Sequence, residues 1–270
     1  MTTGGFIDVV LDAVVTVFQS RRPPAFCVRG SKAIQFHVGK TFSRPIHDLD
    51  LYAFLEPGAW DCLFLKACTG ACPPFCASPV VVAHDFIHPT LTLPIREYAL
   101  SWQDGKNSLV CQVTFPPTRP EVVQVAAMGT SVSVLAIPEL VAEKLLKFTT
   151  HSQHVHASRQ RAAHAKHLGD LCLLLPYAEQ IEVSEHLHAI ERVLLHEQRN
   201  GEASIGVKGF VIDAQSTIAQ YANGLASVSN EATTSPGTGG PSSPYSPSST
   251  CMAVSRCLEW MNHLAGAVAE

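Results

Sequence analysis

The chain has 270 residues, 46% of them hydrophobic, and a formal net charge of −4, so it is long enough to bury a sizeable core in one large or two small domains. Its nine cysteines are too few and odd in number for a secreted disulfide scaffold of this length. The first residues carry Asp8 inside an apolar run and no basic segment, and no uninterrupted apolar stretch reaches the roughly 20 residues that span a bilayer, so we expect a cytoplasmic protein without a membrane segment.

The first half of the chain has the pattern of an α/β domain. Its predicted elements are a helix over 6–18, a strand over 25–28, a helical turn over 32–38, and strands over 49–55, 79–83, 97–102, 108–115 and 132–137. Asp104-Gly105 lies between two of these strands and predicts that they pair as a hairpin. Residues 56–78 are rich in Pro, Gly and Cys, and we expect them to be irregular.

The second half has a helical pattern that begins at Pro138, a residue suited to the first turn of a helix. Helices are expected over 139–148, 159–175, 184–197 and 252–268, the second of them ending before Pro176. We therefore predict an α/β (α+β) fold, with a small mixed sheet flanked by helices over residues 1–137 and a helical domain over residues 138–226 and 250–270. Residues 227–249 consist mainly of Ser, Thr, Pro and Gly and are expected to form a disordered insert.

The sequence feature with the clearest chemical meaning is Gly30-Ser31 followed by Asp48-Leu49-Asp50 at the start of an apolar strand. Carboxylates at positions i and i+2 of a strand point to the same side, so Asp48 and Asp50 present hard oxygen ligands to one small volume. Gly30 allows a phosphate to approach the backbone, and Ser31 adds a hydroxyl at the start of a helical turn, where anions are favoured. This combination predicts a site for Mg²⁺ and a phosphate group.

Basic residues are concentrated in two segments that contain no carboxylate, Arg29 to His47 and Lys144 to His167. A solvated surface usually mixes its charges, so these segments favour a polyanion site assembled from separate parts of the chain. Chance clustering on a weakly charged surface is the other explanation.

Four stretches of the chain resemble the AbiEii/AbiGii toxin-type nucleotidyltransferases, a family of the DNA polymerase β-like nucleotidyltransferase superfamily. They are F-C-V-R-G-S-K-A-I, R-P-I-H-D-L-D-L-Y, I-P-E-L-V-A-E-K-L-L-K-F and K-H-L-G-D-L-C-L-L. The likeness covers roughly residues 6–55 and 132–175. It implies an enzyme that transfers a nucleoside monophosphate from a nucleoside triphosphate to an acceptor hydroxyl of RNA, such as tRNA, or of a protein, with release of pyrophosphate.

The resemblance also implies roles for individual residues. Asp48 and Asp50 would hold Mg²⁺ or Mn²⁺, Lys144 would contact the triphosphate, and Asp170 would support the active site or the acceptor. The residues expected to bind the nucleotide are Gly30, Ser31, Lys32, Arg44 and Lys144.

One departure from the superfamily pattern concerns the third carboxylate, which its members generally place on a later strand. The strand over 108–115 offers Gln112 there, and Asp104 at the hairpin is the nearest acid. A neutral amide adds no negative charge, so the alternative function is a degenerate relative that binds a nucleotide or a protein partner without turnover.

Two further readings involve other residues. Cys62, Cys68, Cys72 and Cys76 form either a zinc site or a set of free thiols, and the three-residue spacings with Pro73-Pro74 inside fit a zinc site poorly. The D-x-D segment does not match a phosphatase of the haloacid dehalogenase type, because Arg44-Pro45-Ile46-His47 leads into it instead of an apolar strand. The composition allows a Cys-His nucleophilic enzyme, but no sequence motif indicates one.

Overall fold

The structure is a computed structural model of residues 1–270. The residues that it describes are 3–18, 21, 23–70, 75–82, 95–102, 108–127, 129–149, 157–198, 205–232 and 247–269. The chain divides into two compact units, Met1–Ala136 with Leu195–Glu202, and Ile137–Leu194 with Ala203–Glu270. We call them the sheet unit and the helical unit.

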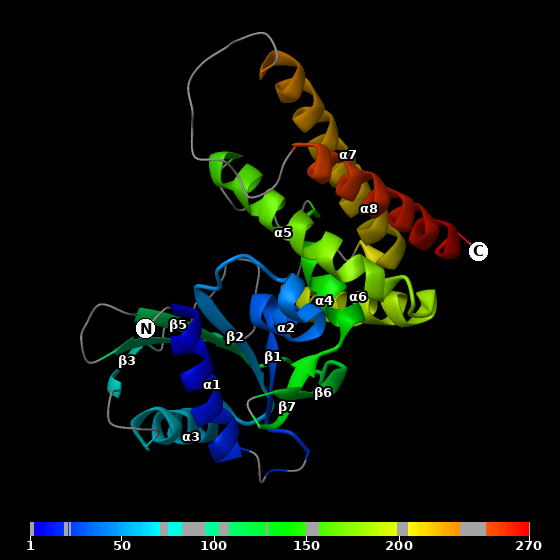
Figure 1. Ribbon diagram of the computed structural model, residues 1–270. Helices are drawn as coiled ribbons and strands as arrows, with labels where there is room; N and C mark the ends of the chain where they lie inside the picture. The colour runs from blue at the N-terminus through cyan, green and yellow to red at the C-terminus, as the bar shows by residue number, and fades with distance from the viewer. Residues whose placement is uncertain are drawn as a thin grey trace. The chain divides into compact units, whose positions relative to one another are not determined.

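The sheet unit contains a seven-stranded mixed sheet (Figure 1). Its strands are β1 (Phe26–Arg29), β2 (Asp48–Ala53), β3 (Phe75–Val82), β4 (Ile95–Trp102), β5 (Ser108–Thr114), β6 (Val122–Ala127) and β7 (Thr130–Leu135), in the order β3-β4-β5-β2-β1-β7-β6. The helical elements of this unit are α1 (Thr3–Phe18), α2 (Gly30–Val38), η1 (Gly39–Thr41) and α3 (Pro57–Gly70). β2 pairs antiparallel with β1 and parallel with β5, so it lies at the centre of the sheet.

The alternation of polar and apolar residues along β2 decides which face of the sheet is buried. Leu49 and Leu51 are fully buried, whereas Asp48 and Asp50 are partly exposed on the opposite face. Helices α1 and α3 pack side by side (Figure 1) and contribute to an aromatic cluster that includes a residue from β1 and one from β4. Its members are Phe18, Phe26, Trp60, Phe64 and Tyr98. The predicted α/β (α+β) class is confirmed by this arrangement.

The prediction that residues 56–78 are irregular was wrong, because α3 covers Pro57–Gly70 and β3 begins at Phe75. Trp60, Phe64 and Ala67 recur at helical spacing and are all buried. Pro57 occupies the first position of this helix, where a missing backbone N–H has no cost. The Pro, Gly and Cys content had obscured the periodicity of three buried residues.

Besides α3 and the short η1, two elements have no counterpart among the predicted ones. β6 forms an antiparallel pair with β7 at the edge of the sheet, and its burial is only partial, so its sequence carries a weak apolar signal. The second element is α7 (Gly206–Ala232), which continues past Ser227 into the stretch expected to be disordered. A helix that is already nucleated extends over Ser and Asn at little cost, which explains why composition gave the wrong boundary.

The helical unit contains α4 (Ile137–Leu146), α5 (Ala157–Ala178), α6 (Val183–Gln198), α7 and α8 (Pro247–Ala267). α7 packs against α8, and α5 packs against both α4 and α8 (Figure 1). The prediction that α5 ends before Pro176 was wrong, because the helix includes this proline and ends at Ala178. A proline in the last turn removes one backbone hydrogen bond, and the helix continues for two more residues. Among the described residues, no helix is both long enough and apolar enough to cross a membrane.

Trp60 provides a test of the corrected assignment of α3. Its ring stacks on Phe18 at 4.9 Å and on Phe64 at 5.6 Å between centroids. We expect Trp60→Ala to lower the free energy of unfolding by about 3–5 kcal/mol, measured by urea denaturation. Cys62→Ala, at an exposed position of the same helix, should change it by less than about 0.5 kcal/mol. Equal effects of the two substitutions would contradict the assignment.

Candidate active site

Asp48 and Asp50 lie at the start of β2, on the face of the sheet that α1 and α3 do not cover. Register pairs Asp50 with Arg29 at the end of β1 and with Gln112 on β5. Directly paired residues of adjacent strands point to the same face, so these side chains form one row across the sheet. The two carboxylates therefore lie together on this face, partly exposed.

Gly30 brings the backbone close to one of these carboxylates. It has φ +63°, and a Cβ built on it would lie 2.2 Å from Oδ2 of Asp50. No side chain fits there, and the left-handed conformation is one that glycine adopts without strain. Gly30 is also the first residue of α2, so the Asp50 carboxylate lies beside a helix N-terminus whose N–H groups favour anions.

Ser31 and Arg44 come together next to this turn. The guanidinium of Arg44 donates a hydrogen bond from Nη2 to Oγ of Ser31 at 2.5 Å, and it also lies 5.0 Å from the ring of Phe42. A guanidinium, a hydroxyl and a helix N-terminus are groups that bind phosphate oxygens. Three of the expected nucleotide-binding residues therefore lie in one place, beside the predicted metal ligands.

Lys32 has a different environment in the structure. It is 6% exposed, and its ammonium donates to Oδ1 of Asp8 at 2.5 Å and to Oε1 of Gln35 at 2.7 Å. The ion pair joins α2 to α1. The structure thus gives Lys32 a structural contact, and its role in nucleotide binding stays a prediction.

Gln112 lies on β5 directly beside Asp50. The sequence predicts this residue at the position where superfamily members have their third carboxylate. Its Nε2 donates to Oε1 of Glu97 at 2.5 Å, and Glu97 is its register partner on β4. The other acid considered, Asp104, lies outside the described residues. Among the residues that the structure describes, no cluster of three or more His, Cys, Asp or Glu suits a metal ion.

Glu97 was missed by the sequence analysis, although a signal for it exists. A hairpin centred between Asp104 and Gly105 places Glu97 opposite Gln112, because the two residues are equally far from the turn. The predicted hairpin therefore already contained the register that brings this carboxylate to the row.

Lys144 and Asp170 meet inside the helical unit. Nζ of Lys144 lies 2.8 Å from Oδ2 of Asp170, and the two side chains are 8% and 0% exposed. α4, which carries Lys144, is buried on almost every side, so the lysine emerges from an apolar helix into contact with a fixed carboxylate. The charge pair offsets the large free-energy cost of burying either ion alone.

Two buried thiols of the sheet unit, Cys68 and Cys111, are not suited to nucleophilic chemistry. Burial raises the pKa of Cys68 to about 12, and burial, with Cys68 and Asp50 nearby, raises the pKa of Cys111 well above its usual value. Cys62 is exposed on the same helix as Cys68. Cys72 and the side chain of Cys76 lie outside the described residues, so the zinc reading is not tested.

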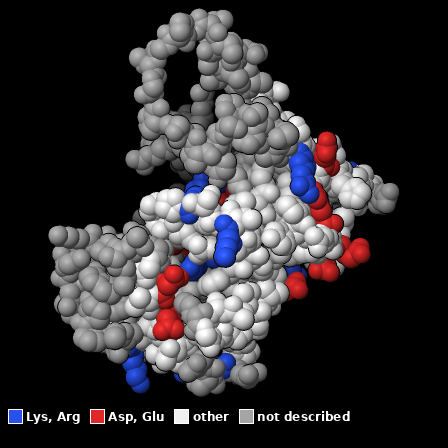
Figure 2. Space-filling model, viewed as in Figure 1, with Lys and Arg blue, Asp and Glu red and all other residues white. Residues whose placement is uncertain are grey.

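The structure describes the two basic segments of the sequence only in part, since the side chains of residues 150–163 lie outside the described ones. Figure 2 shows acidic and basic side chains interspersed over the part of the surface that the structure describes in that view. The pairing of Lys32 with Asp8 and of Lys144 with Asp170 explains part of this, since each lysine meets an acid from a distant segment.

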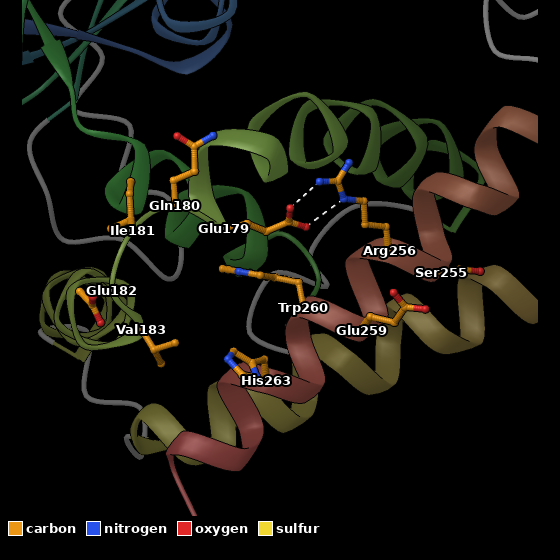
Figure 3. A pocket seen from close by; sticks show the side chains of 10 residues that line it. All are labelled: Glu179, Gln180, Ile181, Glu182, Val183, Ser255, Arg256, Glu259, Trp260 and His263. Carbon is orange, nitrogen blue, oxygen red and sulfur yellow. Dashed lines mark hydrogen bonds and ion pairs between the residues drawn. The ribbon is translucent and has the colours of Figure 1, made fainter.

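A pocket of about 920 Å³ lies in the helical unit between the α5–α6 turn and α8 (Figure 3). Glu179 and Arg256 face each other across it in a two-point ion pair, with Nε 2.9 Å from Oε1. Glu182 and Glu259 also line it, which favours cations over phosphates. None of the predicted site residues lines this pocket, and we do not assign nucleotidyl transfer to it.

No protein-family model and no curated protein matches the sequence. A crystal structure of a proposed nucleotidyltransferase from H. pylori is similar with a TM-score of 0.50 and 12% identity, over 97% of this chain and 96% of that one. JHP933 from Helicobacter pylori has a TM-score of 0.45 and 15% identity, with 97% and 96% covered. The antibiotic-resistance factor ANT(2'')-Ia has a TM-score of 0.44 and 11% identity, with 71% and 92% covered. The first similarity, together with the sheet topology, shows that the chain has the nucleotidyltransferase fold.

The close approach at Gly30 predicts a position-specific effect. Gly30→Ala forces a methyl group against the Asp50 carboxylate in addition to the strain of a positive φ. Gly129→Ala is a matched control, because φ is +74° and nothing lies within 4 Å of the added methyl group. Urea unfolding should show a larger loss of stability for Gly30→Ala, by at least about 1 kcal/mol. Equal losses would mean that Asp50 is not held against the turn.

Two histidines, the half-buried His37 and the buried His186, predict sensitivity to acid. Burial lowers the pKa of His37, whose ring bonds the carbonyl of Leu135 at 2.8 Å, and of His186, whose ring bonds the carbonyl of Ala178 at 2.9 Å. Below a pH of about 6.5 the unfolded chain takes up protons that the folded chain does not, so stability falls as the pH falls. Unfolding curves at pH 7.5 and 5.5 should show this loss, and His186→Gln should reduce it. An unchanged pH dependence in the variant would rule out His186 as a contributor.

Proposed function

We propose that this protein is a metal-dependent nucleotidyltransferase of the AbiEii/AbiGii type that transfers a nucleoside monophosphate from a nucleoside triphosphate to an acceptor hydroxyl. The observation that carries the proposal is the joint placement of Asp48 and Asp50 beside the Gly30-Ser31 turn. The nucleotidyltransferase fold supports it.

The donor atoms at this site fit Mg²⁺ or Mn²⁺. Asp48 and Asp50 offer carboxylate oxygens from one face of β2, and hard divalent cations prefer such ligands. When bound, the ion supplies charge neutralisation at the phosphates and lowers the pKa of the attacking hydroxyl. Asp48 and Asp50 would hold it, with the N-terminus of α2 directly beside Asp50.

Phosphate binding and orientation would be performed by residues of the chain. Ser31, Arg44 and the first N–H groups of α2 would bind the phosphates and orient the α-phosphorus for in-line attack. A bond forms between the acceptor oxygen and the α-phosphorus, the bond from that phosphorus to the pyrophosphate oxygen breaks, pyrophosphate leaves, and the hydroxyl proton passes to solvent. The family resemblance assigns the triphosphate to Lys144 and a supporting role to Asp170. Within the helical unit, the buried carboxylate of Asp170 holds the Lys144 ammonium at 2.8 Å, and both roles stay part of this proposal.

We propose RNA, such as tRNA, as the acceptor. The residues from Lys144 to His167 include five basic side chains and no carboxylate, and Lys166 is exposed on α5. Contacts of this kind to phosphates release counterions, so RNA binding should weaken steeply with salt. A protein hydroxyl is the other acceptor that the assay below detects.

The metal ligands provide the direct test. Transfer of label from each α-³²P-labelled nucleoside triphosphate, with Mg²⁺, to RNA or protein should fall at least about 100-fold in Asp48→Asn and in Asp50→Asn, because the amides lack the charge that holds the ion. Both variants should remain folded, since these side chains are partly exposed. Asp12→Asn, exposed on α1, is the control and should keep full activity. Full transfer activity in Asp48→Asn or in Asp50→Asn would contradict the proposal.

A further inference from the structure

Three side chains from three strands form a continuous polar row beside the proposed metal site. Asp50 on β2 pairs in register with Gln112 on β5, and Gln112 pairs with Glu97 on β4. Adjacent strands are about 4.8 Å apart, and paired residues point to one face. The row therefore runs from the proposed metal ligand through an amide to a second carboxylate.

The hydrogen bond within this row fixes the orientation of the amide. A carboxylate is an acceptor only, so the group of Gln112 that contacts Oε1 of Glu97, at 2.5 Å, is the Nε2 donor. The carbonyl oxygen of an amide points away from its nitrogen. With Nε2 bonded to Glu97, Oε1 is the atom of the amide left to accept or to ligate beside Asp50, the register partner of Gln112 on β2.

The charge of Glu97 is available to this row. Its sequence neighbour Arg96 points to the opposite face of the sheet, where Nε lies 3.7 Å from Oδ2 of Asp61 on α3. On the same face, Val110 and Ala99 flank Gln112 and Glu97 on one side, and Thr114 and Ile95 flank them on the other, where Thr114 accepts a hydrogen bond from Arg29. Glu97 therefore adds a negative charge directly next to Gln112.

We propose that Gln112 is the third oxygen ligand of the metal centre, and that Glu97 is a positioning residue that holds the Gln112 amide with its carbonyl toward Asp50 and supplies the negative charge that the amide lacks. The missing third carboxylate is thus present one strand further along the sheet, acting through Gln112. This inference rests on the proposed function, because it needs a cation at Asp48 and Asp50. Hydrogen-bonding partners of this kind commonly determine how well a ligand binds its metal.

Measuring Mn²⁺ binding to the full chain tests the proposal without relying on turnover. Binding is detected as a decrease of the electron paramagnetic resonance signal of free Mn²⁺. We expect Gln112→Ala and Glu97→Ala each to weaken Mn²⁺ binding about 10- to 100-fold. The double variant should be little weaker than either single one, because the two residues act as one unit. Glu97→Gln keeps an acceptor oxygen but removes the charge, and should fall between wild type and Glu97→Ala.

The exchange variant Glu97→Gln with Gln112→Glu is the rescue test. It moves the carboxylate to β5 and keeps a carboxylate–amide pair, so Mn²⁺ affinity should recover most of the wild-type value. Glu56→Ala, at an exposed position before α3, is the matched control for loss of one negative charge and should bind as wild type does. Circular dichroism and urea unfolding would verify that every variant is folded.

The outcomes separate this inference from the proposed function. Wild-type Mn²⁺ affinity in Asp50→Asn would overturn the metal site itself. Loss of affinity in Asp50→Asn with wild-type affinity in Glu97→Ala or in Gln112→Ala would overturn only the assignment of Glu97 and Gln112. Additive losses in the double variant, or no recovery in the exchange variant, would show that Glu97 does not act through Gln112.

Discussion

The approach of the backbone at Gly30 to the carboxylate of Asp50 constrains the centre of the sheet unit. β1 ends at Arg29, which pairs with Asp50, and the chain must turn into α2 at the very next residue. The turn needs a positive φ, and there is no room for a Cβ beside Oδ2 of Asp50. One glycine therefore sets the end of β1, the start of α2 and the distance between the helix N-terminus and the carboxylate. The rest of the candidate active site is arranged around this contact.

Ion pairs play a comparable part in the core of the helical unit. Lys144 pairs with Asp170, and Glu139 on the same helix accepts from Arg192 on α6. α4 is enclosed by its neighbours, so its charged side chains are buried unless they meet a partner. Such pairs add little net stability but make alternative packings costly, because any other arrangement leaves a buried charge without its partner. They specify how α4 is oriented among α5 and α6.

The parts of the fold that follow from local periodicity were predictable. β2 alternates polar and buried residues over a few positions, and this pattern also placed Asp48 and Asp50 on one face. α3 was missed because its sequence also contains Pro, Gly, Cys and Thr, which lower the apparent helical signal of Trp60, Phe64 and Ala67. The helix forms because those three side chains fill the space against α1 and the sheet. Tertiary packing therefore overrode the local composition.

The sequence by itself determined the two-carboxylate strand, the Gly30-Ser31 turn and the change from an α/β half to a helical half, because each depends on neighbours within a few residues. Only the tertiary structure decided that Gln112 lies beside Asp50, and that Lys32 and Lys144 bind acids from distant segments. The physical reason is that strand register and burial act between residues far apart in the chain. A slip of one residue in the parallel β2–β5 pairing would send Gln112 to the face opposite Asp50, and because no hairpin joins these two strands, no local pattern records which register is formed.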